Sequence, residues 1–321
     1  MSLEVKYRPY KWKHLVGNEK VFDQIRRLVE REINNPADRM PHILFVGPPG
    51  CGKSSCINVI RRAFGIQGRD FKELNLSKEG RIEVLRTEMT AFASTACFTP
   101  GRRKILAGEE IDNMSQAAQQ GLRRDMETRA GLVLYLLTAN DEARIHPAIK
   151  DRCFIARIRP VPDEKIVERL KQICEHEKIE YDEAELFEIA KSANGQVRHA
   201  VKMLSFYEMG GDITALNSEI EKVAEKFVKV AMSSSISEAG RFVAEVVENL
   251  EIDERRFLER VLDFAMENDK LSDLARRNLI LLLGEADYRM AMGANPRIAV
   301  MWLAASLNKK RKPAAKKASR R

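Results

Sequence analysis

The stretch GPPGCGKSS, residues 47–55, has the residue types and spacing of a phosphate-binding loop. Gly47 and Gly52 bracket four residues and are followed by Lys53 and Ser54. Glycines there let backbone N–H groups curve around phosphate oxygens, and the helix N-terminus that follows favours anions. The lysine reaches the β- and γ-phosphates, and the hydroxyl ligates Mg²⁺. We therefore expect ATP and Mg²⁺ as cofactors. The expected loop contacts are Gly47, Pro48, Pro49, Gly50, Cys51, Gly52, Lys53, Ser54 and Ser55.

A second stretch, RRKILAGEEIDNM (residues 102–114), runs from apolar residues into the acids Glu109, Glu110 and Asp112. A phosphate loop needs a second strand that brings carboxylates to the metal. Glu109 is expected to face Mg²⁺, directly or through water, and Glu110 to polarise the attacking water. The alternative is a charged loop after an edge strand, which the accompanying phosphate loop disfavours. Gly108 is expected to interrupt the strand.

Two further side chains suit the same chemistry. Asn140 follows the apolar run LVLYLLT, where strand ends meet the ligand crevice of a parallel sheet. Its amide can hold a water or a γ-phosphate oxygen. Arg152 lies twelve residues further on; a lone arginine is usually a surface charge, but after an ATP site it predicts an arginine finger for a neighbouring subunit.

These residues need a framework, and the first half of the chain predicts one. Apolar runs alternate there with amphipathic segments, which is typical of a parallel sheet covered by helices on both faces. The expected strands are His42–Val46, Phe71–Leu76, Lys104–Ala107, Leu132–Thr138 and Phe154–Ile158. The expected helices among them are Val21–Ile33, Ser54–Phe64, Arg81–Ala93 and Ser115–Glu127.

The pattern becomes entirely helical after residue 162. The next expected helices are Asp163–His176, with Asp163 as N-cap, Asp182–Ser192 and Gln196–Tyr207. The fold class is thus α/β followed by all-α. We expect an α/β nucleotide-binding domain at 1–160, a small helical domain at 161–210, a helical C-terminal domain at 211–308 and a basic tail at 309–321.

The charge of the chain is concentrated in that tail. The net charge is +8, but without the eight Lys and Arg residues of 309–321, 47 basic residues balance 47 acidic ones. A uniformly basic DNA-binding body is therefore excluded, whereas a local basic face is not. The tail predicts a disordered end. Contact with nucleic acid and a merely solubilising role both fit it.

The remaining composition indicates an intracellular protein. No apolar run approaches the roughly 18 residues of a membrane span. The basic, polar first residues lack the apolar core of a signal peptide. The five cysteines form no C-x-x-C pair, so reduced thiols are expected. The helix N-terminus favours a thiolate at Cys51, although a small filler residue is the simpler interpretation.

Longer motifs resemble a known family over Leu3–Leu307. The runs VKYRPYKWKHLVGNE, PHILFVGPPGCGKSS, EEIDNMSQAAQQGLRRDME, ANDEARIHPAIKDRC and NGQVRHAVKMLS are similar to those of replication factor C-type clamp-loader small subunits, which are AAA+ ATPases. The resemblance implies a RecA-like domain, a three-helix lid and a helical collar. It implies a hetero-pentamer with a large subunit and other small subunits. It also implies a sliding clamp and primer–template DNA as partners, at a replication fork in the cytoplasm, or in the nucleus of a eukaryote.

The same resemblance assigns roles to individual residues. The adenine pocket would be formed by Val5, Tyr7, Arg8, Pro9, Val16 and Gly17. Asn140 matches the first sensor of the family, and Arg198 matches the second, which reaches the γ-phosphate from the lid. Arg152 matches the finger that acts in trans.

The chain departs from the family pattern in three places. Its acid box reads Glu-Glu-Ile-Asp rather than Asp-Glu-Ala-Asp, so Glu109 carries one extra methylene. Asp151 replaces a serine, and we expect it to pair with Arg152. At the start of the DNA-facing helix the family has Asp-Arg-Gly-Ile, whereas this chain has Glu-Gly-Arg-Ile at 79–82, so the arginine stands one position later. Lys78, Arg81 and Arg86 are therefore the candidate phosphate contacts. Such contacts carry no sequence specificity.

Two other functions stay open. The altered acids would suit a scaffold or regulatory clamp-loader subunit that binds ATP and hydrolyses it weakly. Another DNA-remodelling AAA+ protein, such as a branch-migration motor or an initiator, is the second alternative. Those proteins normally carry a winged-helix domain, which the helical C-terminal pattern disfavours.

Overall fold

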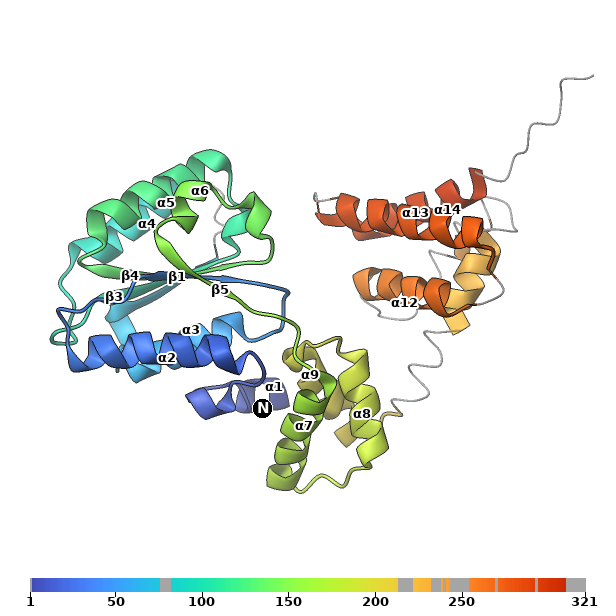
Figure 1. The fold of residues 1–321 in the computed structure, drawn as a ribbon, viewed down its shortest axis with the longest axis horizontal. Coiled ribbons are helices and arrows are strands. Elements are labelled where there is room, and N and C mark those ends of the chain that lie inside the picture. Colours follow the sequence, from blue (N-terminus) through green and yellow to red (C-terminus); the bar gives the residue numbers. More distant parts are fainter. Residues whose placement is uncertain are drawn as a thin grey trace, which may run out of the picture. The chain divides into compact units, whose positions relative to one another are not determined.

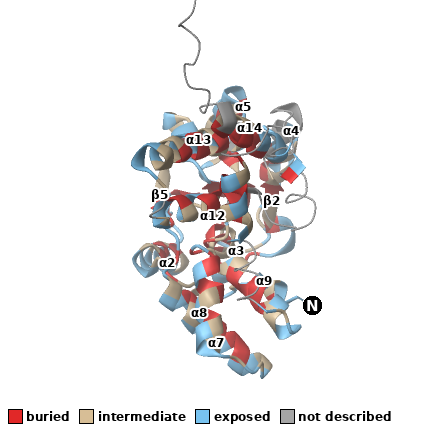
Figure 2. Ribbon diagram, turned by 90° about the vertical axis from the view of Figure 1, so that its right-hand side faces the viewer, coloured by how far each residue is buried: buried red, intermediate tan, exposed pale blue. Residues whose placement is uncertain are grey.

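The computed structural model describes residues 2–75, 82–212, 222–231, 238, 241–242, 254–268, 271–291 and 294–309. The chain divides into two compact units, Met1–Ile213 and Thr214–Arg321. Each unit has its own core. In Figure 2 the helices carry buried residues on one side and exposed residues on the other, as amphipathic sequences require.

The first unit is built on a five-stranded parallel sheet with the order β2-β3-β4-β1-β5. The strands are β1 (His42–Val46), β2 (Phe71–Asn75), β3 (Lys104–Glu109), β4 (Val133–Ala139) and β5 (Cys153–Arg157). The predicted parallel sheet is confirmed, and strand ends differ from the expected ones by at most two residues. The interruption expected at Gly108 was wrong: Gly108 pairs with Leu74 of β2 and Leu137 of β4 inside β3.

Helices cover both faces of the sheet (Figure 1). On one face lie α2 (Glu19–Asn34) and α3 (Lys53–Ala63); on the other lie α4 (Ile82–Ser94), α5 (Gln116–Arg129) and α6 (Pro147–Lys150). Alternation along β1 produces the two layers, since Ile43 and Phe45 pack with α2 and α3 while Leu44 and Val46 pack on the opposite side. Four short 3₁₀ turns complete this part: Trp12–His14, Gly68–Asp70, Ile111–Asn113 and Glu142–Arg144.

A small helical bundle follows within the same unit. It consists of α7 (Asp163–Glu177), α8 (Glu183–Ser192) and α9 (Val197–Glu208), joined by the N-terminal α1 (Leu3–Lys6). Leu3 is buried in the bundle's core, so the two ends of this unit are packed together. Asp182 caps α8 through the N–H of Ala184. The N-cap expected at Asp163 was wrong, because the N-cap is Pro162 and Asp163 lies in the first turn.

The elements assigned among the described residues of the second unit are helices. Its assigned elements include α12 (Glu254–Glu267), α13 (Asp273–Ala291) and α14 (Pro296–Lys309), which share one apolar core. Among the described residues, no helix is long and apolar enough to span a membrane. The domain limits at 160, 210 and 308 stay predictions. Lys78, Arg81 and tail residues 310–321 lie outside the described residues, as does the side chain of Arg86, although Arg86 itself lies in α4.

Candidate nucleotide-binding site

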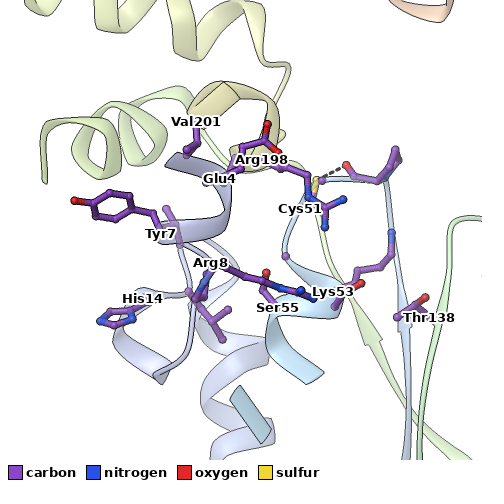
Figure 3. A pocket seen from close by; sticks show the side chains of 18 of the residues that line it. Glu4, Tyr7, Arg8, His14, Cys51, Lys53, Ser55, Thr138, Arg198 and Val201 are labelled. Carbon is purple, nitrogen blue, oxygen red and sulfur yellow. Dashed lines mark hydrogen bonds between the residues drawn. The ribbon is translucent and has the colours of Figure 1, made fainter. Parts of the chain in front are cut away.

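A cavity of about 520 Å³ lies in the first unit, where the carboxyl ends of the strands meet α1 and α9. Most of the predicted site residues line it (Figure 3). They are Val5, Tyr7, Arg8, Pro9, Val16, Pro49, Gly50, Cys51, Gly52, Lys53, Ser54, Ser55, Glu109, Glu110, Asn140 and Arg198. Gly17, Gly47 and Pro48 lie beside the cavity rather than in its lining.

The predicted phosphate-binding loop, residues 47–55, follows β1 and needs glycine for two physical reasons. Gly52, at the N-cap of α3, has φ +99°, a left-handed conformation that side chains disfavour. At Gly47, an added Cβ would lie 2.0 Å from the carbonyl oxygen of Ile158. The loop thus turns tightly against the end of β5 and directs the start of α3 at the cavity.

Lys53 is held at the centre of this loop. Its Nζ donates to the carbonyl oxygens of Gly47 (2.6 Å) and Pro48 (2.9 Å) and to Oδ1 of Asn140 (2.8 Å). Lys53 is only 8% exposed, and burial lowers the pKa of its ammonium group. The lysine therefore links the loop to the end of β4 and supplies a poorly solvated cation to the cavity.

Ser54 and Glu109 come together across the α3–β3 junction. The Ser54 hydroxyl donates to Oε1 of Glu109 at 2.5 Å, so the additional methylene of Glu109 does not prevent the two predicted metal ligands from meeting. A hydroxyl and a carboxylate are hard oxygen donors of the kind that Mg²⁺ prefers. The described residues contain no group of three or more His, Cys, Asp or Glu that could hold a metal. A magnesium ion here would therefore depend on nucleotide phosphates and water for its other ligands, as is usual.

Glu110 adopts an uncommon backbone conformation. Its φ and ψ of 56° and 47° are left-handed, which costs a non-glycine residue about 1–3 kcal/mol. The Glu110 N–H donates to Oγ1 of Thr138 (3.2 Å), and its Oε2 accepts from Nδ2 of Asn113 (3.3 Å). The turn directs Glu110 away from the line of β3 while keeping it on the cavity wall.

Asp112 connects the acidic turn to Asn140. It is 5% exposed, and its Oδ2 accepts from the backbone N–H groups of Asn140 and Asp141, both at 3.1 Å. The third acid of the box thus positions the loop after β4 rather than facing the cavity. Sequence reasoning missed this role and that of Thr138, although a hydroxyl closing the apolar strand β4 was an available signal.

The helical bundle closes the cavity over the predicted phosphate-binding loop. The Arg198 side chain lines the cavity, and Figure 3 shows it pointing toward Cys51 and the loop. The Arg198 N–H donates to the Gly50 carbonyl at 3.5 Å, and the Cys51 thiol lies 3.5 Å from the carbonyl oxygen of Gly195. Cys51 is 1% exposed and burial raises its pKa, which agrees with a small filler residue and not with a thiolate. It fills the contact between loop and bundle.

The N-terminal segment ties the other end of the cavity to α7. The Tyr7 hydroxyl bonds to Glu177 and lies 2.6 Å from Nδ1 of His176, while Lys6 pairs with Glu177 at 2.7 Å. Burial and the Glu177 carboxylate raise the pKa of Tyr7. Tyr7 therefore fixes this wall of the cavity through contacts that no short sequence motif reveals.

The residues predicted for the adenine pocket are spread along the cavity and do not all lie at one end of it. Val16 packs with the bundle core near Tyr7, and Val5 is 61% exposed at the cavity rim. Arg8 extends toward Ser55 in Figure 3. It lines the main cavity and also a smaller one beside Ser54.

Arg152 is the predicted site residue that lies far from the others. It directly precedes β5, whereas the loop and the acids follow β1 and β3, so it lies at the opposite edge of the parallel sheet. Its guanidinium pairs with Glu127 of α5 and donates to the Ala148 carbonyl at 2.6 Å. The pairing expected with Asp151 was wrong, because Glu127 is the partner.

A buried amide bridges the acidic turn and the segment that leads to Arg152. Gln119 is 1% exposed, and its Nε2 donates to the carbonyls of Ile111, Met114 and Arg144 at 3.0–3.4 Å. Its Oε1 accepts from the His146 N–H at 2.7 Å. No feature of the sequence signals this role, since a glutamine in a charged helix usually faces solvent.

Comparison with known proteins shows the family of the chain. Residues 43–161 match the family described as ATPase family associated with various cellular activities (AAA). The replication factor C small subunit of Staphylothermus marinus is 30% identical, with 96% of this chain and 95% of that protein aligned. The chain belongs to the replication factor C small subunit family. The family's small subunit from Archaeoglobus fulgidus is also 30% identical, over 91% of this chain and 92% of its own.

Solved structures support the fold. The Thermotoga maritima RuvB Holliday junction branch migration motor aligns with a TM-score of 0.53 at 16% identity, over 90% of this chain and 86% of that one. A mutant form of the same RuvB aligns with a TM-score of 0.55 at 16% identity, over 91% of this chain and 87% of that one. At such low identity the likeness shows the fold alone. The match to the AAA family of ATPases implies that this chain binds ATP.

Proposed function

We propose that this chain is an ATP-hydrolysing subunit of a sliding-clamp loader. The observation that carries the proposal is the meeting of Lys53, Ser54, Glu109, Glu110, Asn140 and Arg198 at one cavity. In that arrangement Lys53 and Arg198 face the phosphates. The adenine would bind at the end of the cavity near Tyr7 and Val16, which Val5 and Pro9 also line and which Gly17 adjoins. Arg8 lies between the base and phosphate ends.

The proposed reaction is hydrolysis of the γ-phosphate. The oxygen of a water molecule bonds to the γ-phosphorus, the bond to the β-phosphate oxygen breaks, and ADP and inorganic phosphate result. Glu110 takes the proton of the attacking water, and Asn140 orients that water or a γ-phosphate oxygen. Ser54 and Glu109 would hold Mg²⁺, which supplies positive charge to the phosphate oxygens.

The remaining positive charge is proposed to come from a neighbouring subunit. Arg152 lies too far around the sheet to reach its own chain's cavity, and 33% of its side chain is exposed. In a ring of a large subunit and several small subunits, it would act as the finger for the adjacent site. Residues 161–210 would form the lid, and residues 211–308 the collar that joins the subunits.

We further propose that the ATP-bound assembly opens a sliding clamp and loads it on primer–template DNA inside the cell, and that hydrolysis releases both. Lys78, Arg81 and Arg86 are the candidate phosphate contacts. The tail 309–321 would add sequence-independent attraction for DNA.

Replacement of Glu110 by Gln tests the proposal. In the assembled loader with primed DNA and clamp, Glu110→Gln should lower the ATPase rate by at least about 100-fold while ATP affinity is retained. Glu142→Gln is a matched control, because Glu142 pairs with Arg157 on an exposed turn and should leave the rate unchanged. Equal rates for the wild type and Glu110→Gln would reject the catalytic assignment. A slow wild type that still loads clamps would favour the scaffold function instead.

A further inference from the structure

A second cavity, of about 250 Å³, adjoins the nucleotide cavity. Its polar lining consists of Arg8, Ser54, Asn58, Arg61, Glu73 and Glu109. Four of these side chains also line the nucleotide cavity, so the two cavities meet beside the proposed metal ligands. The proposed steps of ATP binding and hydrolysis leave Asn58, Arg61 and Glu73 without a role.

Arg61 is fixed in place by its neighbours. Helix α3 puts Ser54, Asn58 and Arg61 on one face, at spacings of four and three residues. Nη2 of Arg61 donates to Oδ1 of Asn58 at 2.9 Å, and the guanidinium lies 4.8 Å from the centre of the Phe71 ring. Its Nε is buried and has no hydrogen-bond partner. A planar cationic group is therefore held at the cavity wall by its neighbours.

Three charged side chains of this cavity form no ion pair with any residue that the structure describes. Within the described parts of the chain, neither Arg8 nor Arg61 nor Glu73 belongs to a salt bridge. Burial lowers the pKa of Arg61, the charges of Arg62 and Arg8 lower it further, and Glu73 raises it. Arginine nevertheless keeps its proton. Two guanidinium groups thus share one small space, an arrangement that an anion would stabilise.

We propose that this second cavity, which we call the phosphate annex, binds the inorganic phosphate produced by ATP hydrolysis. The proposal rests on the proposed function of the chain as an ATPase. The forked N–H donors of arginine suit a tetrahedral oxyanion. The annex opens beside Ser54 and Glu109, where the γ-phosphate would be cleaved. Another part of its wall adjoins the adenine end, since Asn58 donates to the Pro9 carbonyl at 3.4 Å. With a volume of about 250 Å³ next to the proposed metal ligands, the annex suits a free phosphate better than a second nucleotide.

The two acids of the annex determine how firmly phosphate is held. Glu109 accepts the Ser54 hydroxyl and would be neutralised by Mg²⁺, so it opposes an anion only weakly. Glu73 is exposed, so solvent screens its repulsion of an anion without removing it. Two arginines against one free carboxylate attract phosphate without trapping it. The annex would thus be a temporary site on the way out of the nucleotide cavity.

Titration of inorganic phosphate into the full-length protein with Mg²⁺ and ADP tests this. Calorimetry at constant ionic strength, with sodium chloride replaced stepwise by phosphate, separates specific binding from screening. Arg61→Gln should weaken phosphate binding about tenfold, because one charge-assisted donor group is lost. Glu73→Gln should strengthen it, because an opposing charge is removed.

The neighbouring arginine supplies the control. Arg62 follows on the same helix but does not line the annex and lies over the Tyr10 ring, 5.6 Å from its centre. Its charge acts on Arg61 only through space, so Arg62→Gln should weaken phosphate binding much less than Arg61→Gln. Arg61→Gln binding phosphate as tightly as the wild type, or no phosphate binding by the wild type, would overturn the proposal. The titration uses ADP and needs no hydrolysis, so a failure of the ATPase proposal shows separately in the Glu110→Gln assay.

Discussion

The charged residues at the carboxyl-end edge of the parallel sheet are arranged differently from those at the amino-end edge. At the edge where the strands end, Lys53, Glu109 and Asn140 converge on one cavity and are tied into it by hydrogen bonds. At the edge where the strands begin, Arg152 is paired with Glu127 beside a separate surface hollow of about 420 Å³. Parallel topology forces this separation, because every strand puts its two ends on opposite edges.

The difference suggests a division of labour between copies. In the proposed function, the edge where the strands end binds ATP and places the attacking water. The other edge presents Arg152, which within its own chain bonds to Glu127 and the Ala148 carbonyl and lies outside the nucleotide cavity. On this proposal each chain would have a nearly complete site at one edge and the missing component of a neighbour's site at the other. Assembly would therefore be required for full activity.

Removal of Arg152 gives the largest expected effect. In the assembled loader, Arg152→Ala should lower the ATPase rate by about 10³-fold, the usual contribution of an arginine finger. The ATP affinity of the isolated subunit should not change, since Arg152 does not line the nucleotide cavity of its own chain. Mixing Arg152→Ala with Lys53→Ala subunits at varied ratios measures the effect. Activity that does not depend on which subunits are neighbours would show that the two edges do not cooperate.

The Gln119 bridge links the acidic turn to the segment before Arg152. Gln119→Ala should leave buried carbonyls and the His146 N–H without partners, which costs about 1–3 kcal/mol in the free energy of unfolding. We also expect the ATPase rate to fall about tenfold, because both the acids and the finger lose a positioning contact. Chemical denaturation and steady-state assays measure the two effects.

Gln119→Glu separates stability from positioning. It keeps the acceptor for His146 and loses the donors to the carbonyls of the acidic turn. Its buried carboxylate would also face three carbonyl oxygens, so Gln119→Glu should be less stable than Gln119→Ala and no more active. A variant that is destabilised but fully active would reduce Gln119 to a structural residue and weaken the connection between the edges.

The framework of the first unit was predictable from the sequence for a physical reason. The strands β1 and β4 are buried throughout, and a short run of apolar residues is sufficient to identify such a strand. The helix positions follow from amphipathic spacing in the same way. Loop residues such as Lys53 were predictable because their chemistry requires particular residue types at fixed spacing.

The contacts that were missed join segments far apart in the chain. Tyr7 meets Glu177 170 residues away, and Arg152 meets Glu127 rather than its neighbour Asp151. Cys51 is buried by Gly195, so its thiol is shielded from the solvent that a thiolate needs. Each of these depends on how elements pack, which local spacing does not encode. The second cavity was missed for the same reason, since separate segments of the chain line it.

A smaller effect is expected from the partner of the finger. Glu127→Gln should lower the ATPase rate of the assembled loader about threefold, because a partly exposed ion pair contributes about 0.2–1 kcal/mol to holding Arg152. The ATPase rate should fall at the nucleotide site of the neighbouring subunit and not at the site of the variant subunit itself. Mixing the variant with Lys53→Ala subunits distinguishes the two. Glu30→Gln, which breaks an exposed pair with Arg26 on α2, is the matched control. Equal rates for both variants would mean that Glu127 does not position the finger.

The smallest effect concerns the attachment of the N-terminal segment to α7. Hydrogen bonds from Lys6 and Tyr7 lower the pKa of Glu177 to about 2, below its ordinary value of 4.5. A carboxylate with a lowered pKa stabilises the folded state above its unfolded-state pKa, and the contribution is lost as pH falls through the folded-state value. The difference in unfolding free energy between wild type and Glu177→Gln should thus be constant from pH 7 to about 5 and shrink below about pH 4.5. Hydrogen exchange of residues 3–8 should show the same dependence. A difference that grows on acidification would mean that Glu177 is not held as a carboxylate, and that this wall of the cavity is fixed by packing of Leu3 and Tyr7 alone.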